Sequence, residues 1–135
     1  MTYKVSLGQI PDGEILYRYI RPDALPAGQT EVPDSILQDK NLSCDWKKFQ
    51  EQPETSPQVT QHGKTVILAI KICDDIRNPL NDSGDIQFPQ DIRHSPTPSE
   101  ETPEEAENYA HSLISGRKKL PVTRAICRNS EWYKI

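Results

Sequence analysis

The chain has 135 residues, of which 34% are hydrophobic and 27% are charged, and its net charge is −4. This length is typical of a single domain, and the composition predicts a small core with long polar connections, which excludes wholesale disorder. The longest apolar stretch, Val66 to Ile70, is too short for a membrane span, and the start MTYKVSLGQI does not resemble a secretion signal. We therefore expect a cytoplasmic protein without a membrane partner.

The first part of the chain has the alternation that is typical of strands. Alternating residues predict strands over 2–8 and 14–21, joined as a hairpin through the turn Pro11-Asp12-Gly13. The next region is ambiguous, because it fits a short helix that begins near Asp34, and its NLSCDW segment fits a strand or further helical turns. Cys44 lies in this segment and is far from Cys73 and Cys127, so neither a disulfide framework nor a CxxC pair is indicated.

The middle of the chain contains the clearest strand. Residues 64–73, KTVILAIKIC, are apolar on both faces and rich in β-branched side chains, which predicts a strand buried in the middle of a sheet. A strand over 58–62 would precede it as a hairpin partner. Four prolines and many polar residues then predict a long polar loop over 77–101.

The last part of the chain predicts helices. Thr102-Pro103-Glu104-Glu105 has the pattern of a capping box, and an apolar stripe follows at helical spacing up to Gly116. A second helix begins at Pro121, and EWYKI either extends it or forms an edge strand. The predicted fold is thus a single α+β domain over 1–135, a small and mostly antiparallel sheet with a C-terminal helical pair, residues 102–135, packed on it.

The charges are distributed unevenly. Residues 1–107 hold 10 Lys and Arg against 19 Asp and Glu, whereas residues 108–135 hold 6 against 1. A helix-turn-helix-like segment could therefore contact nucleic acid through Arg117, Lys118, Lys119, Arg124 and Arg128. The acidic body and the position of Pro121 argue against that interpretation, and the same five cations could instead pair with the acidic body or bind a protein partner.

Candidate metal and catalytic groups are few. Asp34 and Asp45, the latter followed by Trp46-Lys47, fit the spacing of a PD-(D/E)xK nuclease, but Pro-Asp occurs at three places in the chain, which indicates chance. His111 lies four residues after Glu107, which predicts a surface ion pair. A general-base role for His111 with Cys44, Cys73 or Ser112 stays an open alternative.

Two resemblances concern the residues around Arg18 and His111. Arg18 in ILYRYIRP with Ser43 in NLSCDW resembles the first two elements of the ADP-ribosyltransferase pattern, which implies contacts with the phosphates and nicotinamide ribose of NAD. Its third element, a catalytic glutamate at a strand start, would have to be Glu131. The segments LYRYIRP, NLSCDW and ENYAHSLISGRKK together resemble small bacterial proteins that share an LYR strand and an NxAH segment, a resemblance that implies no activity.

The sequence holds no phosphate loop, nucleophile elbow or dinucleotide fingerprint, so no catalytic residue, cofactor or metal ligand is predicted. The favoured function is a nonenzymatic accessory subunit of a bacterial cytoplasmic system that binds another protein. A nucleic-acid-binding module is the alternative. A metal-dependent nuclease or an ADP-ribosyltransferase-like enzyme comes third.

Overall fold

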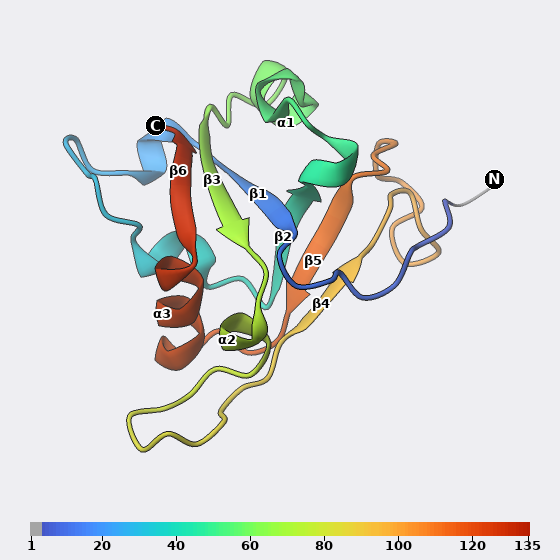
Figure 1. The fold of residues 1–135 in the computed structure, drawn as a ribbon. Helices are drawn as coiled ribbons and strands as arrows, with labels where there is room; N and C mark the ends of the chain where they lie inside the picture. Colours follow the sequence, from blue (N-terminus) through green and yellow to red (C-terminus); the bar gives the residue numbers. More distant parts are fainter. Residues whose placement is uncertain (1–3) are drawn as a thin grey trace.

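The computed structural model describes residues 4–135 and contains a six-stranded antiparallel sheet with the strand order β4-β5-β2-β1-β3-β6 (Figure 1). The strands are β1 (Ile15–Ile20), β2 (Asn41–Trp46), β3 (Val66–Lys71), β4 (Asp91–His94), β5 (His111–Ser115) and β6 (Ser130–Lys134). The helices are α1 (Pro57–Thr60), α2 (Asp74–Arg77) and α3 (Leu120–Arg128). An α+β fold is thus confirmed, although the sheet dominates it. The longest helix, α3, has nine residues, and no helix within residues 4–135 could cross a bilayer.

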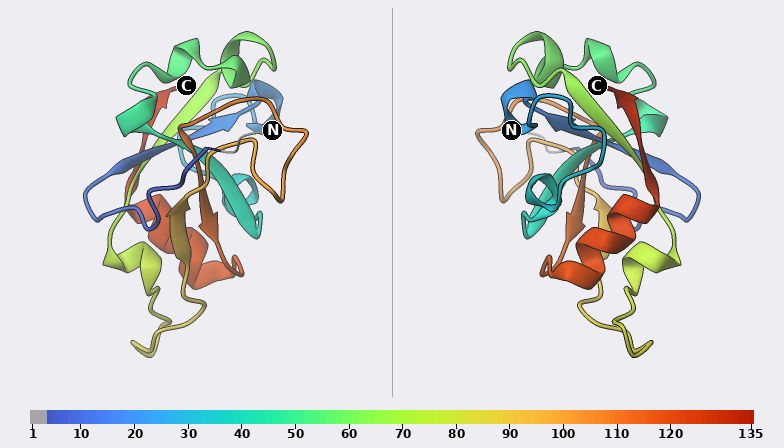
Figure 2. Two further views of the ribbon diagram at one scale, coloured as in Figure 1. Left: turned by 90° about the vertical axis from the view of Figure 1, so that its right-hand side faces the viewer. Right: turned by 90° about the vertical axis from the view of Figure 1, so that its left-hand side faces the viewer.

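The main core lies between the sheet and α3. Val122, Ala125 and Ile126 of α3 are completely buried, and they belong to one apolar cluster with Leu68 and Ile70 of β3. The helix lies against one face of the sheet, as both views of Figure 2 show. Burial of an aliphatic side chain contributes about 1.5–3 kcal/mol, so this face supplies most of the stability.

The opposite face of the sheet has a smaller core. Tyr17 and Tyr19 alternate with residues of the main core along β1 and form a second cluster with Ile67 of β3. Val59 of α1 packs against this cluster, so α1 covers only part of the second face. The remainder of this face, over β2 and β5, has polar side chains.

The predicted strands 14–21 and 64–73 are confirmed as β1 and β3, and NLSCDW is β2. The predicted hairpin over 2–21 is wrong, because β1 pairs with β2 on one edge and β3 on the other. Residues 4–8 form no strand, and residues 2 and 3 lie outside the described part. The strand predicted over 58–62 is also wrong. The Ser56 hydroxyl caps the N–H of Gln58, and α1 follows.

The predicted C-terminal helical pair is wrong in its first member. The Thr102 hydroxyl bonds Ser99 in a closed turn instead of capping a helix. Residues 111–115 then join the sheet as β5 between β2 and β4, because pairing on both edges outweighs a local helical pattern. EWYKI lies in the edge strand β6, and the predicted loop 77–101 contains the short strand β4. Only α3 remains of the predicted pair.

Candidate functional site

The site begins where the two central strands separate. β1 pairs with β3 along six positions but with β2 at only two, Leu16 with Trp46 and Tyr17 with Asp45. Beyond these pairs β1 and β2 diverge, so the backbone of the first half of β2 has no strand partner on that side. A buried carbonyl without a partner is costly, and a side chain must therefore bond it.

Arg18 of β1 supplies those bonds. Its Nη1 donates to the carbonyl of Ser43 at 3.2 Å, its Nε to the carbonyl of Ile36 at 3.3 Å and its Nη2 to Asp39 at 3.1 Å. The side chain is only 17% exposed. A guanidinium has five N–H donors, so two of them have no acceptor among these three bonds. Arg18 is thus a preorganised cation at the gap between β1 and β2.

Ser43 and His111 lie on the second face of the sheet, whereas Arg18, between Tyr17 and Tyr19 on β1, belongs to the face of the main core and bonds the Ser43 carbonyl at the gap. β2 and β5 place them diagonally opposite, since Ser43 pairs with Leu113 and Asp45 pairs with His111. Ser43 Oγ is 2.7 Å from His111 Nε2, and His111 Nδ1 is 2.7 Å from the carbonyl oxygen of Ser95. The carbonyl can only accept, so the proton of a neutral imidazole is on Nδ1 and Nε2 accepts the Ser43 hydroxyl. A hydroxyl, a base and a group that orients the base are therefore aligned.

A buried carboxylate forms the floor of the site. Asp45 is 2% exposed and accepts from the Tyr19 hydroxyl at 2.9 Å and from Asn108 Nδ2 at 2.8 Å. The N–H of Ala110 donates to Asn108 Oδ1, which fixes the orientation of that amide. Burial, reinforced by the adjacent carboxylate, raises the pKa of Tyr19 far above its usual value, so its hydroxyl stays a donor. Within residues 4–135, Asp45 forms no ion pair with a lysine or arginine.

These groups surround one small pocket of about 80 Å³. Three strands and the segment that contains α1 supply its walls, and Lys64 adds a second cation near Arg18. The lining residues are Arg18, Tyr19, Ser43, Cys44, Asp45, Gln58, Lys64, Asn108 and His111. A cation, a hydroxyl and an oriented imidazole at one opening can bind an anionic group and assist a proton transfer beside it.

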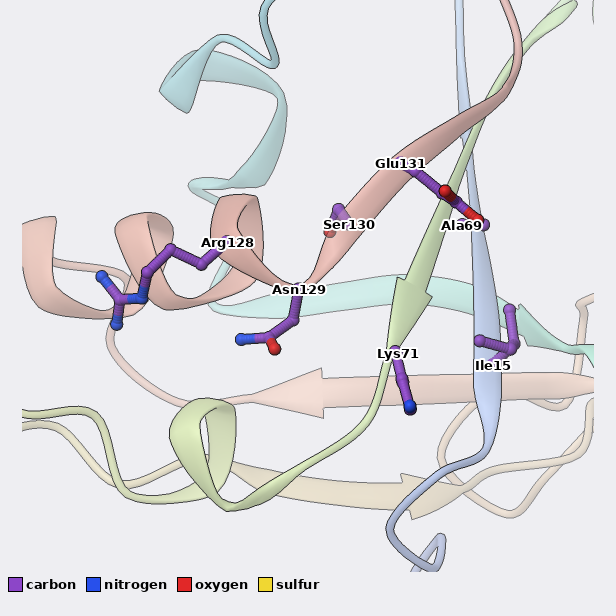
Figure 3. A pocket seen from close by; sticks show the side chains of 7 residues that line it. All are labelled: Ile15, Ala69, Lys71, Arg128, Asn129, Ser130 and Glu131. Atoms are coloured by element: carbon purple, nitrogen blue, oxygen red, sulfur yellow. The ribbon is translucent and has the colours of Figure 1, made fainter.

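The structure separates the predicted third element of the ADP-ribosyltransferase pattern from the first two. Glu131 lies on β6 opposite Ala69, three strands from Ser43, which corresponds to about 14 Å. It lines a different groove of about 330 Å³, where Arg128 extends away from it (Figure 3). The assignment of Glu131 is therefore wrong, and His111 at the start of β5 lies beside Arg18 and Ser43 in its place.

Three of the five predicted binding cations have partners within the fold. Arg128 bonds both oxygens of Asp75, and this hydrogen bonding holds the pKa of that carboxyl below its usual value. Arg124 lies 3.8 Å from Asp82, and Lys118 donates to backbone carbonyls. Arg117 and Lys119 are exposed. A helix-turn-helix is absent from this segment because α3 is its single helix.

Two other predicted constellations are dispersed. Asp34 begins the short 3₁₀ helix 34–37 and does not line the pocket that contains Asp45, and no cluster of three potential metal ligands occurs in residues 4–135. Glu107 pairs with Lys4 at 2.5 Å, so its predicted ion pair with His111 is wrong. HSLIS places two polar residues before two apolar ones and does not alternate, so the local sequence contains no signal for a strand that presents His111 to Ser43.

Comparison with known proteins identifies no relative. No protein-family model, no curated protein and no solved structure matches this chain.

Proposed function

We propose that the protein is an ADP-ribosyltransferase-like enzyme that binds NAD at the gap between β1 and β2 and cleaves its bond to nicotinamide. One observation carries the proposal: Arg18, Ser43 and His111, from three strands that are distant in sequence, converge at one pocket. Arg18 bonds the Ser43 carbonyl at 3.2 Å, and the Ser43 hydroxyl lies 2.7 Å from His111. The resemblance of Arg18 and Ser43 to the pattern of that family implies the ligand.

The proposed roles follow from the free hydrogen-bonding capacity of each group. Arg18 retains two N–H donors for phosphate oxygens, and Lys64 lies in the wall of the same pocket. The Ser43 hydroxyl donates to His111, which leaves its oxygen lone pairs to accept from a ribose hydroxyl. These contacts orient the substrate and supply no chemistry by themselves.

His111 is the proposed general base. When the bond between the ribose carbon and nicotinamide breaks, nicotinamide leaves with the bonding electrons and the ribose carbon becomes electron-deficient. The oxygen of water or of an acceptor hydroxyl then bonds that carbon and gives its proton to Ser43 Oγ, while the Ser43 hydroxyl proton moves to His111 Nε2. The Ser95 carbonyl, 2.7 Å from Nδ1, orients the ring and stabilises the imidazolium that forms. The buried Asp45 lies on the same face and adds negative charge beside it.

The test is nicotinamide release from NAD, quantified by chromatography, because hydrolysis needs no knowledge of the acceptor. We expect His111→Gln and Ser43→Ala to lower the rate by roughly 100-fold or more, and Arg18→Lys to raise KM. Glu131→Gln is the matched control and should release nicotinamide at the wild-type rate. An inactive wild-type protein that also fails to bind NAD in calorimetry would remove the proposal.

The expectations drawn from composition stay predictions. The hypotheses of an accessory subunit and of a nucleic-acid-binding module both depend on the uneven distribution of charge along the chain. Neither hypothesis uses the convergence of Arg18, Ser43 and His111. A cytoplasmic location remains part of the proposal, supported by the free cysteines Cys44, Cys73 and Cys127, which suit a reducing compartment.

A further inference from the structure

A second concavity lies where β2 begins and β5 ends. It has a volume of about 430 Å³ and shares no lining residue with the pocket of Ser43 and His111. Four of its five lining residues are cationic and none is acidic: Gln38, Lys40, Arg117, Lys118 and Lys119. We call this concavity the basic groove. Sequence position alone did not associate Lys40 with the other three cations.

Arg117 of the basic groove differs from the other arginines in its partners. Within residues 4–135, six of the seven arginines form ion pairs, and Arg117 is the one that does not. Its guanidinium lies over the Phe88 ring, 5.7 Å from the centroid, which orients it without using its N–H donors. Lys40 and Lys119 have no side-chain hydrogen bonds or ion pairs within residues 4–135, a property that they share with Lys47, Lys48, Lys64, Lys71 and Lys134; what sets them apart is their position beside Arg117. Although the chain has 20 Asp and Glu, Lys40, Arg117 and Lys119 of the basic groove form no ion pair with a carboxylate within residues 4–135.

The shape of the basic groove is fixed by its backbone. Lys118 Nζ donates to the carbonyls of Lys40, Ile114 and Gly116 at 2.8–3.0 Å, and the N–H of Gly116 donates to the same Lys40 carbonyl. Gly116 has φ +147°, and a Cβ there would lie 2.6 Å from Gln90 Nε2, so only glycine fits. Burial lowers the pKa of Lys118 to about 8, which is still above neutral pH, so the ammonium group is still mostly charged there. The groove is therefore formed before any ligand arrives.

We infer that the basic groove binds phosphate groups, with Lys40, Arg117 and Lys119 as the donors. The planar fork of Arg117 matches two phosphate oxygens, and the lysine ammonium groups act as point charges beside it. Lys118 adds charge without contact, because its three N–H donors are already used. The inference does not depend on the proposed NAD chemistry, since the two sites have no residue in common.

The experiment compares two triple variants with the same loss of charge. Lys40→Gln, Arg117→Gln and Lys119→Gln together remove the donors but keep the backbone bonds of Lys40. Lys47→Gln, Lys71→Gln and Lys134→Gln remove three exposed lysines that line neither the basic groove nor the pocket. The probes are inorganic pyrophosphate, followed by calorimetry, and a labelled single-stranded RNA of about 12 nucleotides, followed by anisotropy.

We expect pyrophosphate to bind the wild type and the control triple, and the groove triple to bind at least about tenfold more weakly. RNA that binds more tightly than pyrophosphate, with a log–log salt slope near about −2, would identify a nucleic-acid backbone as the source of the phosphates. Similar affinities would identify a free phosphate compound. The inference is overturned if neither probe binds at millimolar concentrations, or if both triple variants weaken binding equally.

Discussion

The two halves of the sheet differ in what they contribute. β1, β3 and β6 pair along most of their length, and β3 supplies completely buried residues to the core. β2, β4 and β5 also supply completely buried residues to the main core, among them Leu42, Ile92 and Ile114, and their opposite face carries Ser43 and His111. Both halves thus contribute to the main core, and the second half also presents polar side chains on the face opposite that core.

The largest effect expected from this comparison is on stability. Ile70→Ala in β3 removes a completely buried side chain and should lower the free energy of unfolding by about 2–5 kcal/mol. Leu113→Ala in β5, half-buried on the polar face, should cost at most about half as much. Urea denaturation of both variants measures the difference, and equal losses would contradict the division between the core face and the polar face.

The buried carboxylate is the exception within the polar half. Asp45→Ala leaves the Tyr19 hydroxyl and the Asn108 amide without their acceptor and should cost about 3 kcal/mol. Asp85→Ala, an exposed acidic residue, should change stability by less than about 0.5 kcal/mol. Thermal unfolding compares the two. A loss for Asp45→Ala no larger than that of the control would mean that the Asp45 network is not structural.

His94 of β4 makes the polar half sensitive to acid. Its ring is buried, Nδ1 accepts the N–H of Leu7 at 3.0 Å, and Nε2 lies 2.6 Å from the Tyr109 carbonyl. Burial lowers the pKa of His94, so the unfolded chain binds the proton first. Stability is present above about pH 6.5 and is lost as the pH falls through the folded-state pKa, by about 1.4 kcal/mol per pH unit.

The measurement is urea denaturation at several values between pH 7 and pH 5. His94→Gln should flatten the profile, because glutamine does not titrate. Hydrogen bonds lower the pKa values of Asp75 and Asp91, so these carboxylates take up protons only below about pH 4 and do not change stability between pH 7 and pH 5. A profile that is identical in the variant and the wild type would show that His94 does not cause the acid sensitivity.

The smallest effect is expected at the surface next to α3. The Arg128 side chain is 53% exposed, and its ion pair with Asp75 lies at the surface. Arg128→Gln should cost less than about 1 kcal/mol, and added salt should reduce the difference from wild type. Thermal unfolding at low and high salt measures this cost. A loss of stability larger than that of Asp45→Ala would mean that the surface ion pair contributes more than the buried Asp45 network.

The sequence predicted the apolar half better than the polar half. The strands β1 and β3 could be predicted because they are rich in β-branched and aromatic residues, which are enriched in strands. The segment 102–114 satisfied both a capping box and a helical stripe, yet its partners β2 and β4 determined its conformation, and no local pattern contains that information. Arg18 and Ser43 were identified as a pair, but His111 was assigned to a helix and Glu131 to their site.

The convergence of Arg18, Ser43 and His111 is tested most directly by nuclear magnetic resonance with ADP-ribose as the probe. We expect saturable shifts in the backbone amides of these three residues and of Asn108, and their loss in Arg18→Gln. Control residues on β6, including Glu131, should not shift. Shifts confined to β6 and α3, or no shifts at millimolar ADP-ribose, would contradict a nucleotide site between β1 and β2.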